Sequence, residues 1–227
     1  MILAAGRGER MRELTEHCPK PMLPVGGRPL IDHHLEKLAL AGVKSVVVNV
    51  AWCADVLTEY LDHSDNFGLS IEISHEPEGL ETGGGIFNAL PLLGSEPFIA
   101  VNGDVWSDYD YSLLAQRALL DNDLIHLVMV ENPEHNLKGD FDVSESGRCL
   151  IRPKYTFSGL RLMRAELLSD AQAGKFSLVP FLRAAITGQQ ATAEIYSGRW
   201  LDVGTPERLE ALNEELGLKS GGCLPWP

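Results

Sequence analysis

The feature that most constrains this fold lies at the start of the chain, where a short apolar segment runs directly into a glycine turn. Residues 1–5 read Met-Ile-Leu-Ala-Ala, and glycines follow at positions 6 and 8. Because glycine has no side chain, a phosphate group can come close enough to such a turn to accept hydrogen bonds from backbone N–H groups. The pattern therefore predicts a strand followed by a phosphate-binding turn made of Ala5, Gly6, Arg7 and Gly8.

Three basic side chains follow within fourteen positions of Gly6, namely Arg7, Arg10 and Lys20. Such side chains neutralise phosphate groups and donate hydrogen bonds to them. Lys20 stands between two prolines, whose fixed backbone leaves the lysine on a stiff segment. A stiffly held cation can meet a charge that develops in a transition state without reorganising. We therefore expect this stretch to hold a nucleoside triphosphate for attack at its α-phosphate.

Two better-known phosphate loops do not fit this stretch. A Walker A loop ends in glycine and lysine, and no lysine stands at that spacing from Gly6 or Gly8. The dinucleotide fingerprint requires a third glycine where this chain has Met11. What remains is the pattern Leu-Ala-Ala-Gly-x-Gly-x-Arg-Met, followed by Pro-Lys-Pro around Lys20.

Strand and helix patterns alternate along the first 130 residues. Apolar periodicity predicts strands at 43–50, 69–74, 97–104 and 124–130, and helices at 29–41, 54–61, 82–93 and 113–120. This alternation predicts an α/β fold with a doubly wound, mostly parallel sheet between two helix layers. Ligands bind beyond the carboxyl ends of such strands, so Gly6, Thr82–Gly85 and Asn102–Asp104 should gather at one edge.

Beyond Gly139 the predicted strands become shorter. They lie at 139–143, 148–151, 156–162, 193–196 and 199–203, with helices at 176–187 and 205–216. Thr205 followed by Pro206 is typical of the start of the last helix. No repeat or linker divides the chain, so we predict a single domain over residues 1–216 and a poorly ordered tail over 217–227.

Composition excludes several classes of protein. The 227 residues carry 19 Lys and Arg against 32 Asp and Glu, a net charge of −13, which argues against binding to nucleic acid or an anionic membrane. The apolar runs are far shorter than the roughly 18 residues of a membrane span, and no secretory signal stands out. The four cysteines form no C-x-x-C pair and are interpreted as reduced thiols of a cytoplasmic protein. The first strand is short, so we expect native residues to precede Met1.

Two aspartates are candidate metal ligands. Asp104 ends a predicted strand in Val-Asn-Gly-Asp-Val, and Asp202 does so in Trp-Leu-Asp-Val-Gly-Thr-Pro-Glu. Taken alone, an aspartate at a strand end is usually a turn former. Mg²⁺, however, prefers a few carboxylates together with substrate phosphate oxygens, so beside the N-terminal loop these two residues predict a Mg²⁺ site.

The motifs together resemble the sugar-1-phosphate nucleotidyltransferase family. The glycine loop, Pro-Lys-Pro-Met, Thr-Gly-Gly-Gly, Asn-Gly-Asp and Trp-x-Asp-Val-Gly-Thr-Pro-Glu-Arg-Leu occur in that order over nearly the whole chain. The resemblance implies a GT-A-like (Rossmann-like) fold, with a nucleotide-binding portion at 1–138 and a sugar-binding portion at 139–216. It implies phosphate contacts by Arg10 and Lys20.

The same resemblance implies roles for further residues. Asp104 and Asp202 would act with Arg10 and Lys20 in catalysis and carry Mg²⁺. Residues of the nucleotide site would be Ala5, Gly6, Arg7, Gly8, Lys20, Glu78, Thr82 and Gly83. Residues of the sugar site would be Asn102, Gly139, Asp140 and Ser158.

Two short, stand-alone groups of the family are similar to this chain. One is the N-acetylmuramate-1-phosphate uridylyltransferases of bacterial cell-wall recycling, and the other is the short mannose-1-phosphate guanylyltransferases. Leu-Glu-Thr-Gly-Gly-Gly and Tyr-Thr-Phe-Ser-Gly favour the first, which implies transfer of a uridylyl group from UTP to N-acetylmuramate α-1-phosphate. Departures are Glu13 at a common proline position, Glu81 at a frequent glycine position, and the lack of a Glu-Glu-Lys-Pro-like motif in 148–155.

Muramate carries a lactyl carboxylate that requires a cation or several N–H donors. Arg28, Arg152, Lys154 and Arg161 are the available cations. A protein that senses nucleotide-sugars without chemistry is the alternative from another class, and a nicotinamide-dependent oxidoreductase is disfavoured by Met11. We expect a monomer with small-molecule substrates.

Overall fold

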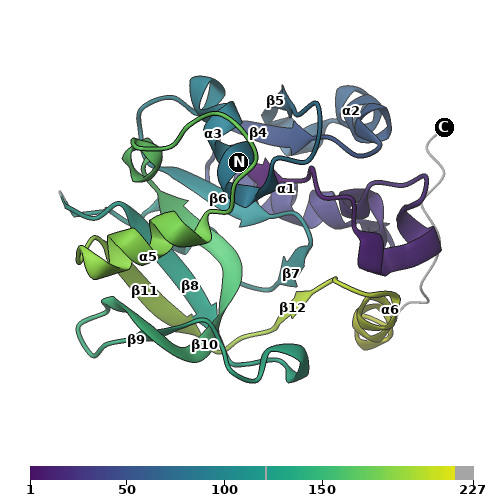
Figure 1. The fold of residues 1–227 in the computed structure, drawn as a ribbon. Coiled ribbons are helices and arrows are strands. Elements are labelled where there is room, and N and C mark those ends of the chain that lie inside the picture. Colours follow the sequence, from purple (N-terminus) through teal and green to yellow (C-terminus); the bar gives the residue numbers. More distant parts are fainter. Residues whose placement is uncertain (121, 218–227) are drawn as a thin grey trace.

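The computed structural model describes residues 1–120 and 122–217. The tail predicted at 217–227 therefore lies outside the described residues apart from Gly217. Within the described part, eight strands form one sheet in the order β11-β8-β10-β6-β1-β4-β5, with β9 paired to β10 (Figure 1). These strands are β1 (Ile2–Leu3), β4 (Ser45–Val50), β5 (Ser70–His75), β6 (Phe98–Asn102), β8 (Ile125–Val130), β9 (Phe141–Val143), β10 (Cys149–Met163) and β11 (Ala191–Tyr196).

Smaller elements complete the fold. Two short strand pairs are β2 (Pro24–Val25) with β3 (Arg28–Pro29), and β7 (Val105–Ser107) with β12 (Trp200–Asp202). The α-helices are α1 (Leu30–Leu40), α2 (Ala54–His63), α3 (Glu81–Leu93), α4 (Ser112–Ala115), α5 (Val179–Thr187) and α6 (Pro206–Glu215). The 3-10 helices are η1 (Glu9–Thr15), η2 (Lys20–Met22), η3 (Asn66–Gly68), η4 (Glu134–Asn136) and η5 (Ala165–Leu168).

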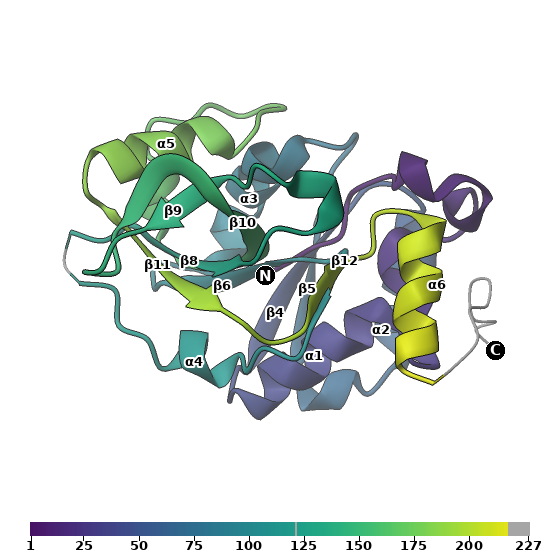
Figure 2. The same cartoon turned by 90° about the horizontal axis from the view of Figure 1, so that it is seen from below.

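The sheet is mostly parallel and covered on both faces, as predicted. β1 runs parallel to β4 and β6, as do β4 to β5 and β8 to β11, whereas β10 runs antiparallel to β6 and β8. Figure 2 shows α3 and α5 on one side of the sheet and α1 and α4 on the other. The three-layer α/β/α prediction is therefore confirmed.

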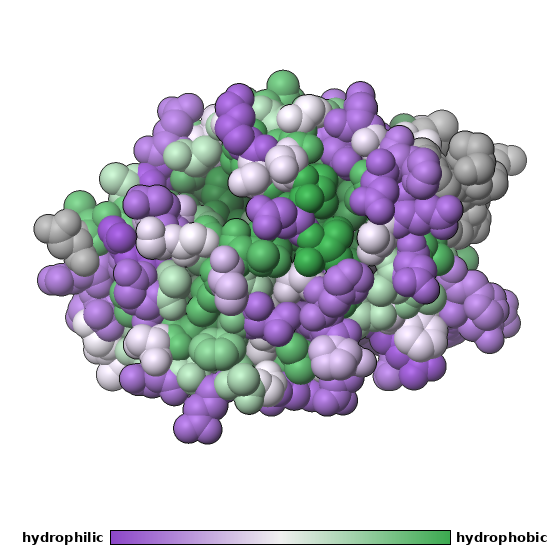
Figure 3. Space-filling model, turned by 90° about the horizontal axis from the view of Figure 1, so that it is seen from above, coloured by the Kyte–Doolittle hydropathy of each residue, from purple (hydrophilic) through white to green (hydrophobic). Residues whose placement is uncertain are grey.

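Alternating strand residues supply two separate hydrophobic cores. Val46 and Val48 of β4 join the core under α1, whereas Val47 between them joins the core under α3 and α5. A buried parallel strand must be apolar on both faces, which explains the continuous apolar run in β4. On the outside, Figure 3 shows a face with hydrophilic side chains around its rim and hydrophobic ones toward its middle.

Two expectations about elements need correction. The separate strands predicted at 148–151 and 156–162 are one long strand, β10, whose register shifts between Phe157 and Arg161 around Gly159 at φ +86°. The helix predicted at 113–120 is only α4 (Ser112–Ala115). The helix predicted at 82–93 is α3, whose first turn contains Thr82–Gly85.

The three glycines of α3 are explained by close packing. A Cβ atom added to Gly83 would lie 2.5 Å from the Phe176 ring, and one added to Gly84 would lie 2.2 Å from the carbonyl oxygen of Gly174. A backbone hydrogen bond from the Gly84 N–H to the Phe176 carbonyl (3.0 Å) holds the two segments together. The glycines therefore let residues 174–176 reach the beginning of α3.

Two further observations concern membrane spans and the cysteines. No helix within residues 1–120 and 122–217 is long and apolar enough to cross a membrane. Cys53 and Cys149 are free thiols, as expected. Cys18, however, is disulfide-bonded, which contradicts the expectation of reduced cysteines for this residue, because spacing along the chain says nothing of which thiols meet in space. Cys223 lies outside the described residues.

The packing against α3 generates a stability prediction. Gly84→Ala is expected to lower the free energy of unfolding by about 1–3 kcal/mol, because the added methyl group meets a backbone oxygen. Gly79→Ala is the matched control, since nothing lies within 4 Å of a Cβ atom at that position. Urea unfolding of both variants measures the difference, and equal midpoints for the two would show that residues 174–176 relax without cost.

Candidate active site

A cavity of about 870 Å³ lies at the carboxyl ends of β1, β4, β5 and β6. Ligand sites of open α/β sheets form at this edge, so its position agrees with the expectation from sequence. From the N-terminal stretch the cavity is lined by Ala5, Gly6, Arg7, Gly8, Arg10 and Lys20. From the end of β6 and the segments after β5 and β6 it is lined by Glu78, Thr82, Asn102 and Asp104.

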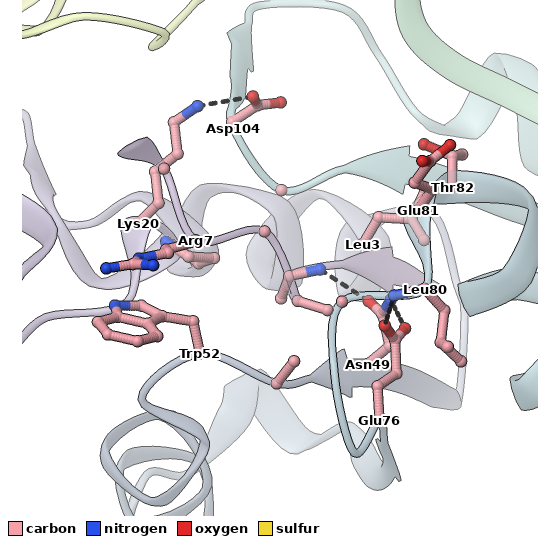
Figure 4. A pocket seen from close by; sticks show the side chains of 18 of the residues that line it. Leu3, Arg7, Lys20, Asn49, Trp52, Glu76, Leu80, Glu81, Thr82 and Asp104 are labelled. Atoms are coloured by element: carbon pink, nitrogen blue, oxygen red, sulfur yellow. Dashed lines mark hydrogen bonds and ion pairs between the residues drawn. The ribbon is translucent and has the colours of Figure 1, made fainter. Parts of the chain in front are cut away.

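The glycine turn is fixed by hydrogen bonds from residues of η1. Gly8 has φ +66°, which favours glycine, and its carbonyl accepts hydrogen bonds from Met11 N (2.8 Å) and Thr15 Oγ1 (3.0 Å). Trp52 Nε1 in turn donates to the Thr15 carbonyl (2.8 Å). The Arg7 guanidinium lies 4.4 Å from the centre of the Trp52 ring, a cation–π contact (Figure 4). Trp52 therefore holds both the turn and its first arginine.

Lys20 reaches across the cavity to a carboxylate. Its Nζ lies 2.7 Å from Asp104 Oδ2, drawn as a dashed line in Figure 4. The lysine side chain is 9% exposed and that of Asp104 is 36% exposed, so the carboxylate is the more accessible partner. Lys20 begins η2, where Leu23 N donates to its carbonyl (3.1 Å). This turn gives the stiff lysine position that the flanking prolines predict.

A buried polar network forms the floor between the glycine turn and α3. Asn49, at the end of β4, accepts from Ala4 N (2.7 Å) and donates through Nδ2 to Glu76 Oε1 (2.6 Å). The other carboxylate oxygen of Glu76 accepts from Leu80 N (2.8 Å). A Cβ atom at Gly85 would lie 2.6 Å from Glu76 Oε1, so this glycine is needed for the network. The network thus couples the start of the glycine turn to the segment before α3.

The backbone places Asp202 beside Asp104, but the Asp202 side chain has other partners. β12 pairs with β7, and Val203 N donates to the Asp104 carbonyl (2.7 Å). The Asp202 carboxylate accepts from Arg208 Nη1 (2.6 Å) and lies 2.9 Å from His135 Nε2. It does not line the cavity itself.

Gly204 separates Asp202 from the cavity. This glycine lines the cavity, and a Cβ atom on it would lie 3.0 Å from Asp202 Oδ2. Asp104 directly precedes β7 and Asp202 ends β12, so the pairing of these two strands brings the two aspartates near each other. Mg²⁺ bound together with substrate phosphates needs only one or two carboxylates, and Asp104 is the one of these two aspartates that lines the cavity.

Of the residues expected to contact a sugar, the structure brings one to the cavity. Asn102 lines it, and its Oδ1 accepts from Arg161 Nη1 (3.1 Å). Arg161 is fully buried, and this burial lowers the pKa of its guanidinium to about 9. Ser158 is buried, and its Oγ accepts from Leu160 N (3.1 Å) at the irregular part of β10.

The other predicted residues stand apart from the cavity. Gly139 and Asp140 lie next to β10, where Asp140 Oδ2 accepts from Phe157 N (2.8 Å). Gly83 packs against Phe176 as described above. These residues and Ser158 do not line the cavity among the described residues.

Sequence reasoning missed several residues that line the cavity, namely Asn49, Trp52, Glu76 and Lys175. The first three lie at or just after the carboxyl ends of β4 and β5, so the rule that singled out Asn102–Asp104 could have found them. Lys175 gives no such signal, because only the packing of Phe176 against α3 brings its loop to the cavity. It is exposed, and among the described residues no ion pair is recorded for it.

The fold and the cavity define an α/β protein that handles phosphorylated ligands, with a glycine turn, cations and a carboxylate at one sheet edge. The chain belongs to the nucleotidyl transferase family, whose sequence pattern matches residues 1–147. It is therefore a transferase of nucleotidyl groups.

Relatives extend this similarity over nearly the whole chain. The N-acetylmuramate alpha-1-phosphate uridylyltransferase of Neisseria meningitidis serogroup B is 44% identical over 220 residues, which are 92% of this chain and 94% of that protein. The Caulobacter vibrioides protein of the same name is 34% identical over 224 residues, 91% of this chain and 92% of that protein. The crystal structure of HddC from Yersinia pseudotuberculosis superposes with a TM-score of 0.77 at 24% identity, covering 94% and 97% of the two chains.

The buried network generates a second prediction. Asn49→Ala is expected to lower the free energy of unfolding by about 1–3 kcal/mol, because it removes the partner of the Ala4 N–H and of Glu76 Oε1. Asn88→Ala is the control, since this exposed amide donates to Ser74 Oγ (3.0 Å) outside the network and should cost less than about 1 kcal/mol. Urea unfolding at pH 7 compares them.

Asn49→Asp tests the same contact through pH. Two carboxylates at this distance disfavour ionisation, so the folded-state pKa of the pair would be raised above its unfolded value. A raised folded-state pKa means that stability increases as pH falls toward it. The variant should therefore regain stability relative to the wild type between pH 7 and pH 5, and an equal loss at both values would contradict a direct contact with Glu76.

Proposed function

We propose that this enzyme transfers a uridylyl group from UTP to N-acetylmuramate α-1-phosphate, giving UDP-N-acetylmuramate and pyrophosphate, as a step of cell-wall recycling in the cytoplasm. The observation that carries the proposal is the 44% identity over 92% of the chain to a relative named for this activity. The cavity supports it, because cations of the glycine turn and a half-exposed carboxylate line one space large enough for two substrates.

The proposed chemistry needs charge neutralisation more than proton transfer. The attacking oxygen of the sugar phosphate is ionised near neutral pH, so no general base is required. Two anionic groups must approach each other while pyrophosphate leaves in line. Arg7, Arg10 and Lys20 would reduce this repulsion from the side of the glycine turn, and the network through Asn49 would keep that turn in place.

Asp104 and Asp202 are proposed as the residues that hold Mg²⁺, which when bound would supply Lewis-acid stabilisation of the phosphate charge. Asp104 would contribute the accessible carboxylate, and Asp202 the one behind Gly204. Arg208 and His135 would orient Asp202, since both contact its carboxylate.

The lactyl carboxylate of muramate needs a positive partner in the acceptor site. Arg28 is paired with Glu36 (2.5 Å), and Arg152 and Lys154 are both paired with Asp142. Arg161 is buried beneath Asn102. None of these four cations lines the cavity among the described residues, whereas Lys175, which sequence reasoning missed, does.

Pyrophosphate release tests the proposal directly. Purified protein should turn over UTP with N-acetylmuramate-1-phosphate faster than GTP with mannose-1-phosphate, measured over the four nucleoside triphosphates and a panel of sugar phosphates. Higher kcat/KM for GTP and mannose-1-phosphate would instead support the guanylyltransferase reading, and absence of turnover with every pair would support a nucleotide-sugar sensor.

The metal assignment gives a further prediction. Asp104→Ala and Asp202→Ala should each lower kcat by at least about a hundredfold while thermal unfolding remains cooperative, because charge stabilisation by the metal is lost. Asp104→Asn and Asp202→Asn preserve side-chain shape and should show the same loss together with a raised Mg²⁺ requirement. Asp110→Ala is the control, since this carboxylate only accepts from Ser112 in an exposed turn. Wild-type rates in either alanine variant would remove the assignment.

A further inference from the structure

Arg7 is held by an aromatic ring and not by a carboxylate. Its guanidinium carbon lies 4.4 Å from the centre of the Trp52 ring, and both residues line the cavity. The Arg7 side chain is exposed, and its guanidinium has neither a hydrogen bond nor an ion pair within residues 1–120 and 122–217. The arginine therefore keeps its full charge, and its N–H donors remain available to a ligand.

The other cation–π contacts of the described residues involve cations that have a second partner. Arg199 lies over Trp106 (5.1 Å) but also forms an ion pair with Glu215 (2.6 Å). The remaining three cations contact a carbonyl, carboxylate or amide oxygen as well, and they are Lys37, Lys154 and Arg161. Within the described part of the chain, Arg7 is thus the one cation of this group whose charged end contacts only a ring.

The Trp52 ring is fixed relative to the glycine turn. Trp52 comes shortly after the end of β4, and its Nε1 donates to the carbonyl of Thr15 in η1 (2.8 Å). Thr15 Oγ1 in turn donates to the Gly8 carbonyl (3.0 Å). The indole therefore connects the end of β4 to the turn that carries Arg7, and its face has a defined position against the guanidinium.

Stacking and ion pairing have different consequences for an arginine that binds an anion. A carboxylate partner neutralises the cation and must be displaced when a phosphate group arrives, as at Lys20 and Asp104. An aromatic face attracts the guanidinium without occupying the N–H donors at its edge. It also restricts the side chain before the ligand binds, which reduces the entropy lost on binding. A stacked arginine is thus oriented in advance and still able to donate.

The direction of Arg7 indicates which phosphates it would meet. Figure 4 shows Lys20 reaching Asp104, whereas the Arg7 side chain points away from Asp104 and lies against Trp52. In the proposed function the reacting α-phosphate meets the metal held by Asp104. Arg7 is therefore placed for the two phosphates beyond it, which leave as pyrophosphate.

We propose that Trp52 is a positioning residue that orients Arg7 toward the part of the triphosphate that leaves as pyrophosphate. The inference rests on the proposed function, in which Arg7 neutralises phosphate charge, and deepens it by assigning the group that orients this arginine. The effect of Trp52 runs through Arg7, because the ring carries no charge and its N–H group is bound to the Thr15 carbonyl.

Two substitutions of Trp52 separate the ring face from the N–H group. Trp52→Phe and Trp52→Leu both remove the donor to Thr15, but only the phenylalanine keeps an aromatic face. The leucine variant should have a kcat/KM for UTP about threefold to tenfold below that of the phenylalanine variant, the range for a partly exposed cation–π contact. The difference should lie in KM for UTP, with KM for the sugar phosphate unchanged.

A double-mutant cycle tests whether Trp52 acts through Arg7. The probe is inorganic pyrophosphate, whose affinity is measured by isothermal titration calorimetry. Arg7→Ala should weaken its binding by about tenfold to a hundredfold, as for a hydrogen bond to a charged group. Trp52→Leu should weaken it by about threefold to thirtyfold beside Arg7, and by less than about twofold where Arg7 is already alanine. A purely structural tryptophan would give the same loss in both backgrounds.

A fluorescence measurement covers the case in which the leucine variant does not fold. The emission of the wild type minus that of Trp52→Phe reports the Trp52 indole. Saturating pyrophosphate should change this difference, because it binds the guanidinium that lies on the ring. The change should be absent when the same pair of proteins carries Arg7→Ala, and its persistence there would contradict the proposal.

Arg199→Ala is the matched control for the loss of a stacked arginine. Arg199 also lies over a tryptophan, is exposed, and does not line the cavity that the described residues form. The variant should keep the pyrophosphate affinity and the kcat/KM for UTP within about twofold of the wild type. A loss as large as that of Arg7→Ala would indicate a general effect of net charge and would count against the proposal.

Three further results would overturn the inference and leave the proposed function intact. These are equal kcat/KM for the phenylalanine and leucine variants, losses of Arg7→Ala and Trp52→Leu that multiply in the double variant, and a wild type that turns over UTP without binding pyrophosphate. A wild type that binds pyrophosphate with the expected coupling but turns over no triphosphate would support the role of Trp52 and defeat the proposed function. The two failures are therefore distinguishable.

Discussion

The backbone register of β1 is the constraint on which the candidate site depends. This strand has only two residues, yet it pairs on both sides, so that Leu3 stands level with Asn49 of β4 and Asn102 of β6. Gly103 N donates to the Leu3 carbonyl (2.8 Å), and a Cβ atom on Gly103 would lie 2.6 Å from that oxygen. A slip of one residue would turn every side chain of β1 to the opposite face. The cavity is thus set by a few hydrogen bonds of the main chain before any functional side chain is considered.

Local signals in the sequence were sufficient for much of this arrangement. The alternation of apolar segments predicts the order of most elements, and Thr205 indeed caps α6 by accepting from Arg208 N (3.4 Å). The glycine turn and the residues after β6 could be placed at one edge because parallel strands end on the same side. Such features depend on short stretches of chain, so they can be predicted from a single sequence.

Other features depend on contacts between distant segments and could not be predicted. The bulge around Gly159 makes room for Asn102, because a Cβ atom on Gly159 would lie 3.0 Å from that amide. Lys175 reaches the cavity only because Phe176 packs on Gly83. Asp202 is held by Arg208, which comes close to it because of the turn into α6 and not because of its position on a strand. The role of residues 139–216 in sugar binding, and that of the predicted site residues, stays a prediction.

The ion pair between Lys20 and Asp104 has a consequence for how the site responds to its medium. With their charged atoms 2.7 Å apart, these side chains already satisfy each other before any ligand arrives. A ligand that binds both side chains breaks one ion pair and forms two other interactions. The net binding energy is therefore a difference between similar electrostatic energies. Dissolved salt weakens the ion pair between Lys20 and Asp104 as well as the interactions with the ligand. The ligand affinity that Lys20 and Asp104 contribute is consequently insensitive to ionic strength. The affinity that the exposed Arg7 and Arg10 contribute is sensitive to it.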